Sequence, residues 1–232
     1  MNILALDTST EYCSVALLQD GTMNERSELV GQKHSEVLMT MLDDLLKESD
    51  VSINQLDVIA FGKGPGSFTG VRIACGVAQG LALGGDLNVV GVCTLEALAQ
   101  ASGHDKVIAA LDARMSEIYL AAYEKSTGGW KTVCEPCLCA ATDSPSVSGE
   151  EWFGVGSGYA VQDAALQAHY GQQLSGVDAK AVPQASAIAQ IAATELTKGN
   201  AVDAALALPL YLRNKVALKT SERDDARAAV AR

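Results

Sequence analysis

Two segments of the chain, one near its start and one near its middle, share a single pattern, and this constrains the fold more than any other feature. ILALDTSTEYCSVALL begins at Ile3 and IAALDARMSEIYLAAY begins at Ile108, so that Asp7 aligns with Asp112. Each segment is an apolar run ending in Leu-Asp, a short polar turn and a second alternating run, which is the pattern of a β-hairpin. We therefore expect an internally duplicated chain in which each half begins with a hairpin.

The rest of each half alternates between strand-like and helix-like patterns. In the first half a strand-like run near 27–30 precedes an expected helix at 35–47 and the strand LDVIAFG. The second half continues with a glycine turn in EWFGVGSGYA and with expected helices near 161–169 and 185–197. This order predicts an α/β fold with two lobes and mixed sheets, the N-terminal lobe spanning 1–104 and the C-terminal lobe 105–232.

Composition and charge exclude several classes of protein. Hydrophobic residues make up 48% of the 232 residues and charged residues 19%, as in a compact globular protein. No apolar run approaches the roughly 20 residues of a spanning helix, and the first residues carry no basic targeting segment, so we expect a cytoplasmic protein without a membrane partner. The net charge of −11 argues against a protein that binds nucleic acid by itself, because phosphate contacts dominate such binding.

A glycine cluster, GKGPGSFTG, opens a helix expected at 67–83. It is not a Walker P-loop, since Lys63 precedes the glycines that it should follow, and the dinucleotide and nucleophile-elbow motifs are also absent. What remains is a strand, a turn and a helix capped by Ser67 or Thr69. The N-terminus of such a helix can hold an anion, or the glycines can simply turn the chain.

Gly76, Gly80 and Gly84 recur every fourth residue and form one bare ridge along this helix. Each glycine disfavours the helix by about 1 kcal/mol relative to alanine, so close approach of another backbone is expected to compensate. That backbone can belong to a second subunit or to the protein's own sheet. The helix at 35–47 favours a second subunit. Beyond its buried stripe it carries further apolar side chains that one core does not need, namely Val37, Met39 and Leu46.

The six cysteines are typical of free thiols in a chain of this size. Cys134, Cys137 and Cys139 form the one cluster, CEPCLC. It lacks the strand-to-helix setting of a thioredoxin-type redox pair and the fourth ligand of a structural zinc site, so we interpret it as a loop without an assigned role.

The chain resembles two nested families. The paired lobes, each with an acidic residue after its first strand, resemble the actin-like ATPase (ASKHA, RNase H-like) superfamily. The segments MNILALDTSTEYCSVALLQDG, GKGPGSFTGVRIACGVAQGLA, LDARMSEIY and PLYLRNKVA are similar, in order and spacing along nearly the whole chain, to the TsaB (YeaZ) family. The resemblance ends near Lys219, and the charged tail beyond it is expected to be mobile.

The TsaB resemblance implies a function. Members of that family are non-catalytic partners of the tRNA-modifying enzyme TsaD, with which the ATPase TsaE also assembles. The complex adds threonylcarbamoyl to the adenosine beside the anticodon of tRNA. For this chain the resemblance implies a heterodimer with TsaD, a homodimer when alone, contact with tRNA only through the complex, and no cofactor of its own.

The resemblance also implies site residues. The interface is expected on the two helices of the N-terminal lobe, at Leu38, Met41, Leu42, Leu45, Arg72, Gly76 and Gly80. A weak or vestigial nucleotide site is expected at Asp7, Thr8 and Ser9, because the loop lacks the glycines that let a backbone approach phosphate. We expect no catalytic residue and no metal site, since the three histidines do not share helical spacing and H-E-x-x-H is absent.

Two other functions stay open at this point. The first is an ASKHA-type small-molecule kinase or ATPase that uses Asp7, and the second is a purely homodimeric regulator. Asp7 also has a structural interpretation, in which it caps its own turn. The same interpretation applies to Asp112, with Arg114 as an ion-pair partner.

Overall fold

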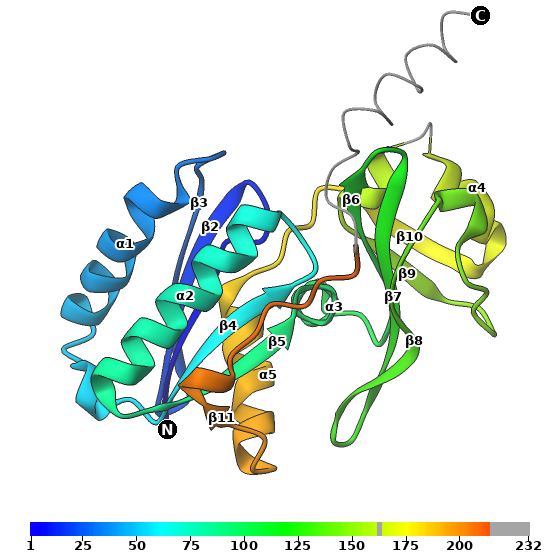
Figure 1. Ribbon diagram of the computed structural model, residues 1–232. Coiled ribbons are helices and arrows are strands. Elements are labelled where there is room, and N and C mark those ends of the chain that lie inside the picture. Colours follow the sequence, from blue (N-terminus) through cyan, green and yellow to red (C-terminus); the bar gives the residue numbers. More distant parts are fainter. Residues whose placement is uncertain (162–163, 214–232) are drawn as a thin grey trace, which may run out of the picture.

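The computed structural model describes residues 1–161 and 164–213. The charged tail expected from about residue 219 lies outside the described residues. Within the described part the strands form two sheets, one in each of two lobes that lie side by side (Figure 1). No helix in this part of the chain is long and apolar enough to cross a membrane.

The first sheet is mixed. Its central strands are parallel, whereas the second and third strands of the chain and the short last strand run antiparallel to their neighbours. In spatial order it contains β11 (Val202–Asp203), β5 (Asn88–Cys93), β4 (Val58–Gly64), β1 (Asn2–Asp7), β2 (Tyr12–Gln19) and β3 (Thr22–Leu29).

The second sheet repeats this topology without a counterpart of β11. In spatial order it contains β10 (Leu174–Asp178), β9 (Trp152–Val155), β6 (Lys106–Arg114), β7 (Glu117–Ser126) and β8 (Gly129–Cys139). β6 pairs antiparallel with β7 and parallel with β9, as β1 does with β2 and β4. The duplicated two-lobe α/β fold expected from the sequence is therefore confirmed.

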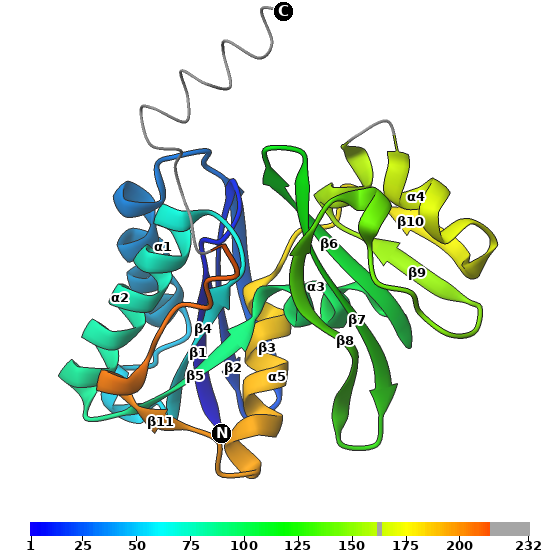
Figure 2. The ribbon, with the colours of Figure 1, turned by 45° about the vertical axis from the view of Figure 1, so that its right-hand side comes forward.

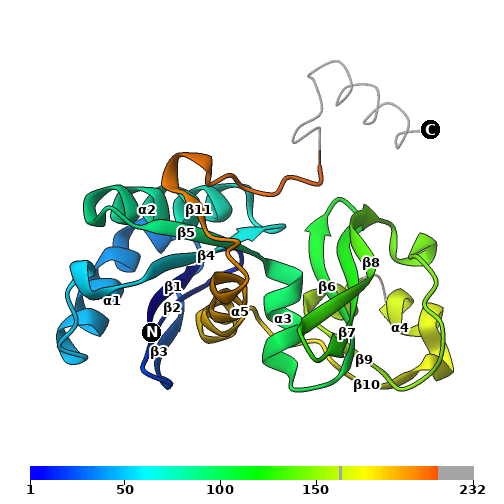
Figure 3. The same cartoon turned by 90° about the horizontal axis from the view of Figure 1, so that it is seen from below.

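Helices cover both faces of the first sheet (Figure 3). α1 (His34–Glu48) and α2 (Phe68–Gly85) lie next to each other on one face. α5 (Ala185–Thr197) and α3 (Thr94–Ser102) pack on the other, with α3 between the first sheet and the second lobe. α4 (Ala165–Tyr170) packs into the core of the second lobe.

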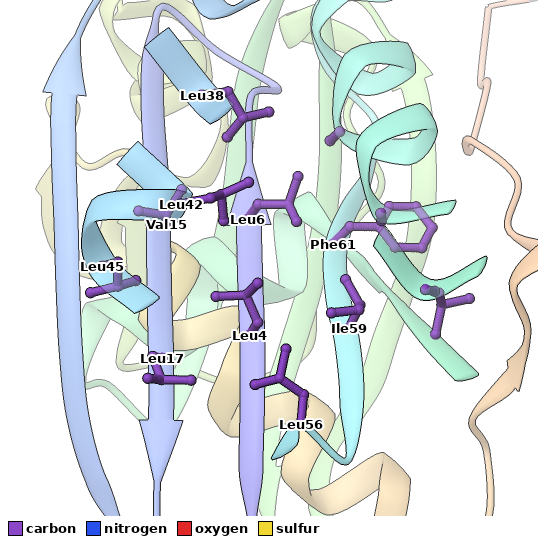
Figure 4. Packing of buried hydrophobic residues seen from close by; sticks show 14 of the residues in the cluster. Leu4, Leu6, Val15, Leu17, Leu38, Leu42, Leu45, Leu56, Ile59 and Phe61 are labelled. Carbon is purple, nitrogen blue, oxygen red and sulfur yellow. The ribbon is translucent and has the colours of Figure 1, made fainter. Parts of the chain in front are cut away.

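The alternation of side chains along β1 explains the two-faced core. Leu4 and Leu6 belong to the cluster under α1 and α2, whereas Ile3 and Ala5 belong to the cluster under α5. Successive side chains of a strand point to opposite faces, so both faces of a central strand must be apolar here. Figure 4 shows Leu38 and its neighbours on α1 pointing onto Leu4, Leu6, Val15 and Leu17.

Most elements lie near their expected positions. α5 has the expected bounds, and α1 and α2 differ from expectation by one or two residues at their ends. α4 is shorter than the helix expected at 161–169, and neither β5 nor α3 was expected. The interpretation of CEPCLC as a loop was wrong, because these residues form the end of β8.

The chain returns to the first lobe after it completes the second. The expected boundary at 104/105 does separate the two sheets, but α5 packs on β1 and β2, and β11 pairs with β5. The segment 204–213 then runs along α2 and reaches the second lobe (Figures 1 and 2). The assignment of all of 105–232 to the C-terminal lobe therefore needs correction, because the first core is completed by residues from 185 onward.

Candidate functional site

The glycine cluster lets two loops approach closely. A Cβ atom at Gly70 would overlap the carbonyl oxygen of Thr8, and one at Gly66 would lie 2.5 Å from the carbonyl oxygen of Ser9. The backbone N–H of Ser67 donates to that same Ser9 oxygen at 2.7 Å. The space that a phosphate-binding loop leaves open is thus filled here by the chain's own β1–β2 loop.

Ser67 caps α2, as the sequence predicted for Ser67 or Thr69. Its Oγ accepts a hydrogen bond from the N–H of Gly70 at 3.3 Å, and its backbone carbonyl accepts one from Val71 at 2.9 Å. The Val71 bond is the first regular bond of the helix, and the Gly70 bond satisfies one of the N–H groups that a helix N-terminus otherwise leaves free.

The expected nucleotide residues are buried and bonded to each other. Asp7, Thr8 and Ser9 are at most 2% exposed. The Thr8 hydroxyl donates to the carbonyl of Gly70 at 2.7 Å, and both the N–H and the hydroxyl of Ser9 donate to Asp7 Oδ1, at 2.9 and 2.7 Å. Asp7 Oδ1 and the Thr8 hydroxyl are therefore bonded within the chain, and the weak or vestigial nucleotide site stays a prediction. The bonds match the structural interpretation of Asp7, which caps its own turn.

One oxygen of Asp7 has no protein partner. Oδ2 is buried without a hydrogen bond and faces the backbone at Gly62, where a Cβ atom would overlap it. Burial raises the pKa of this carboxyl to about 6, because desolvation disfavours the charged form more than the two Ser9 bonds favour it.

Asp112 makes the same local turn in the second lobe. Its Oδ1 accepts from the N–H of Arg114 at 2.8 Å, two positions on, just as Asp7 accepts from Ser9. The predicted ion pair is also present, with Arg114 Nη1 2.9 Å from Asp112 Oδ2. Both aspartates of the duplicated motif therefore have the same structural role, a side chain that closes the turn after the first strand of its lobe.

A cleft of about 600 Å³ lies between the two lobes, next to these turns. Ser9 lines it, but Asp7 and Thr8 do not. Its charged lining groups are all paired: Arg114 lies 3.5 Å from Glu11 and 2.9 Å from Asp112, and Arg213 lies 2.7 Å from Glu117. Apolar and aromatic side chains supply much of the remaining wall, namely Phe68, Val71, Leu111, Tyr119, Leu210 and Tyr211.

The glycine ridge of α2 faces away from the protein. A Cβ atom at Gly76, Gly80 or Gly84 would meet nothing within 4 Å, and all three residues are exposed. The alternative that the ridge packs on the chain's own sheet is therefore wrong. Nothing in the described residues compensates the helix for these three glycines.

The structure corrects the side chains predicted for the interface on α1. Leu38, Met41, Leu42 and Leu45 are at most 4% exposed and belong to the core beneath the helix, so they do not form a surface. The outward apolar side chains are others. Met39 on α1 and Leu83 on α2 are more than half exposed, and Val37, Leu46, Ile73 and Val77 are partly buried at the edges.

Arg72 lies at the N-terminal end of the ridge, between two aromatic rings. Its guanidinium carbon is 3.5 Å from the centre of the Phe68 ring, and its Nε donates to the hydroxyl of Tyr211 at 2.6 Å. Sequence reasoning missed Phe68 and Tyr211, because the contact joins residues far apart in the chain. The sequence offered two signals for this contact, namely the aromatic character of both residues and the position of Tyr211 in the PLYLRN motif.

The histidines and cysteines give no metal site in the described residues. Among 1–161 and 164–213, no group of three or more His, Cys, Asp or Glu side chains could hold a metal ion. His34, the first residue of α1, is buried, with Nε2 3.2 Å from the carbonyl oxygen of Tyr12.

Comparisons with known proteins agree with this architecture. The family model described as "TsaD: tRNA N6-adenosine threonylcarbamoyltransferase" matches residues 26–220. A protein of Escherichia coli named "tRNA threonylcarbamoyladenosine biosynthesis protein TsaB" is 40% identical, over 94% of this chain and 97% of the relative. Its namesake from Haemophilus influenzae is 37% identical, over 94% of this chain and 96% of the relative.

Solved structures show the same likeness. Two solved chains from Pseudomonas aeruginosa, one described as "YeaZ" and the other as an uncharacterized protein with similarity to peptidase YEAZ, each have a TM-score of 0.85 and 38% identity. Each alignment covers 91% of this chain and 99% of the solved chain. Because sequence and fold agree over nearly the full length, the chain belongs to the TsaB (YeaZ) family.

Proposed function

We propose that this chain acts in tRNA threonylcarbamoyladenosine biosynthesis as a non-catalytic scaffold subunit. It binds a TsaD partner through the outer face of α1 and α2, assembles with TsaE, and forms a homodimer through the same face when TsaD is absent. The proposed setting is the cytoplasm, where tRNA is modified, and tRNA contacts the complex rather than this subunit alone.

The open glycine ridge of α2 carries the proposal. Gly76 and Gly80, in the interior of α2, disfavour it by about 1 kcal/mol each relative to alanine, and Gly84 continues the ridge near the helix end. The described part of the chain offers no internal reason for them, because Gly76, Gly80 and Gly84 face open space. A partner helix packed against the ridge would use the bare backbone for close approach, as small residues permit between packed helices.

The side chains around the ridge fit a partner surface. Exposed Met39 and Leu83 add apolar area on either side. At one end, Arg72 is held between Phe68 and Tyr211 with its orientation already fixed. Arginine and tyrosine are enriched among residues that dominate interface energies, partly because a pre-organised side chain loses little freedom on binding.

Charge supports the indirect role toward tRNA. The chain carries a net charge of −11, and the arginines at the interlobe cleft are paired with carboxylates. Phosphate contacts dominate the binding of nucleic acid, so we expect most of the basic groups that hold tRNA to come from another subunit.

Light scattering coupled to size-exclusion chromatography tests the proposal. The wild-type chain, Gly80→Leu and Gly80→Ala are each run alone and with purified TsaD. The wild type is expected to form a homodimer alone and a heterodimer with TsaD. Gly80→Leu is expected to stay monomeric in both runs, because the added side chain holds the partner helix away from the ridge.

Gly80→Ala is the matched control, since it adds one carbon atom and retains part of the association. Circular dichroism establishes that each variant is folded, which the open space around Gly80 leads us to expect. Unchanged association of folded Gly80→Leu would exclude the ridge as the interface. A wild-type homodimer that does not bind TsaD would support the purely homodimeric regulator.

An ASKHA-type kinase or ATPase that uses Asp7 makes a different prediction. Such an enzyme would hydrolyse ATP in the presence of magnesium without partners, and Asp7→Ala would abolish the activity. The scaffold proposal predicts no hydrolysis by either protein. The buried position of Asp7, away from the lining of the cleft, supports the scaffold.

A further inference from the structure

Three of the six cysteines form a cluster of thiols in the second lobe, far from α2 in the fold. Cys134, Cys137 and Cys139 lie on β8, are partly buried, and pack against the same apolar cluster between the second sheet and α4. Cys137 is the middle member of the cluster, and the neighbouring thiols of Cys139 and Cys134 are, after burial, among the groups that raise its pKa. All six cysteines lie within the described residues and are free.

A bulge in β8 brings Cys134 to this face. In a regular strand, residues three positions apart point to opposite sides of the sheet. In β8, however, Cys134 pairs with Ala122 and Cys137 pairs with Leu120, so three steps on β8 match two steps on β7. The extra residue turns the Cys134 side chain onto the face of Cys137, which a strand of regular register would not allow.

The same register sets the spacing of the two cysteines. Cys134 and Cys137 lie opposite Ala122 and Leu120, which are two steps apart on β7. Two steps along a strand correspond to about 6.6 Å, so the Cα atoms of the two cysteines are expected within the roughly 4.4 to 6.8 Å that a disulfide bridges. A disulfide between Cys134 and Cys137 would close a ring that contains the bulge, where the backbone can adjust. A disulfide between Cys137 and Cys139 would close a smaller ring in a part of β8 with regular register, so the first pairing is favoured. The thiol of Cys139 also has another neighbour, the hydroxyl of Ser144 at 3.8 Å.

We propose that Cys134 and Cys137 are a modification site at which peroxide forms an intrachain disulfide. The thiolate of Cys137 attacks one oxygen of hydrogen peroxide, the O–O bond breaks, and the released hydroxide leaves as water after taking up the thiol proton. The sulfur of Cys134 then attacks the resulting sulfenic acid, forming the S–S bond and releasing a second water. Two thiols lose two electrons and one peroxide gains them.

The surroundings of the cluster make the reaction slow at neutral pH. Burial raises the pKa of Cys137 to about 12 and also raises that of Cys134. The titratable groups nearby are Glu135 on β8 and Tyr170 on α4. Since the thiolate is the reactive form, the rate of oxidation is expected to rise about tenfold per pH unit between pH 7 and pH 9.

Peptide mapping after peroxide treatment tests the assignment. The folded full-length chain is treated with hydrogen peroxide, denatured, and its free thiols are blocked with iodoacetamide. The protein is then reduced, and the thiols released from disulfides are labelled with N-ethylmaleimide. Mass spectrometry is expected to find the second label on Cys134 and Cys137, with two of the six thiols lost and no covalent dimer on a non-reducing gel.

Two single variants sharpen the result. Cys139→Ser is the matched control and is expected to form the same disulfide, whereas Cys134→Ser is expected to keep all its remaining thiols under the same conditions. The proposal is overturned if the wild type keeps six free thiols, if the label falls on Cys137 and Cys139, or if Cys139→Ser abolishes the reaction. The wild-type map decides the assignment even if a variant folds poorly.

Discussion

Arg72 and Tyr211 are joined by a hydrogen bond between Nε and the phenol oxygen at 2.6 Å, although 139 positions separate them in the chain. The bond attaches the last described segment of the chain to α2. Two residues on, Arg213 contacts the second lobe, where its guanidinium lies 2.7 Å from Glu117 and donates to the carbonyl of Ala113 at 3.1 Å. One short segment therefore binds both lobes across the cleft.

Replacement of Arg213 by methionine tests this link. Arg213→Met keeps much of the side-chain volume but removes a largely buried charge and its bonds, so we expect a loss of about 1 to 2 kcal/mol in the free energy of unfolding. Urea denaturation measures the loss. Lys47→Met is the control, because its ion pair with Asp43 is exposed and is expected to have no measurable effect. Equal effects of the two substitutions would contradict the link.

Tyr211→Phe removes only the phenol oxygen bonded to Arg72. The ring contact with Phe68, with centroids 5.7 Å apart, remains. Because the bond is exposed, we expect less than about 1 kcal/mol of lost stability. The binding of TsaD should weaken more than the fold, since Arg72 loses its fixed orientation. Calorimetric titration of wild type and variant with TsaD measures this difference, and unchanged affinity would remove Arg72 from the proposed interface.

Gly70 and Gly80 lie on the same helix and are expected to respond to alanine with opposite signs. Gly70→Ala should destabilise the protein by roughly 1 to 3 kcal/mol or more, because the new Cβ overlaps the Thr8 backbone. Gly80→Ala should stabilise the isolated chain by about 0.5 to 1 kcal/mol, since it enters open space in a helix interior. Thermal unfolding at low protein concentration measures both, and a shared sign would refute the packing described here.

The raised pKa of Asp7 predicts that the free energy of unfolding depends on pH. Its pKa is raised from 3.8 to about 6 in the folded state, so the folded protein binds more protons than the unfolded chain between these values. The stabilisation is therefore fully present below about pH 4 and is lost as the pH rises through 6. The loss is roughly 3 kcal/mol, from about two pKa units at 1.36 kcal/mol each.

Asp7→Asn isolates this contribution. Asparagine keeps an oxygen that accepts from Ser9 but does not ionise, so the difference in unfolding free energy between wild type and variant should change between pH 4 and pH 7. The change should favour the variant at higher pH. Urea denaturation at several pH values measures it, and parallel curves would show that Asp7 does not titrate in this range.

The hairpins and the helices α1, α2 and α5 could be predicted because their signals are local. The alternation around Asp7 and Asp112, and the apolar stripe from Leu38 to Leu45, each lie within a single element. The sequence could also locate the glycine ridge, but not which way it faces, because that depends on where the neighbouring sheet lies.

The remaining features depend on contacts between distant parts of the chain. β11 has two residues, and they form a strand only through their antiparallel pairing with β5. The bulge that gathers the cysteines arises from the register between β7 and β8, which no pattern within CEPCLC reveals. The stripe on α1 was assigned partly to an interface, since an apolar face looks the same whether it covers its own sheet or another subunit.

The return of the chain to its first lobe also affects how the protein can fold as it is synthesised. β1 to β5 leave the ribosome early, but one face of their sheet is covered only in part, by α3, until α5 follows about a hundred residues later and packs on β1 and β2. At about 5 to 20 residues per second, that apolar face is exposed for many seconds. The N-terminal lobe therefore cannot complete its core before most of the C-terminal lobe has been translated. We expect a chaperone to protect the nascent chain during that interval.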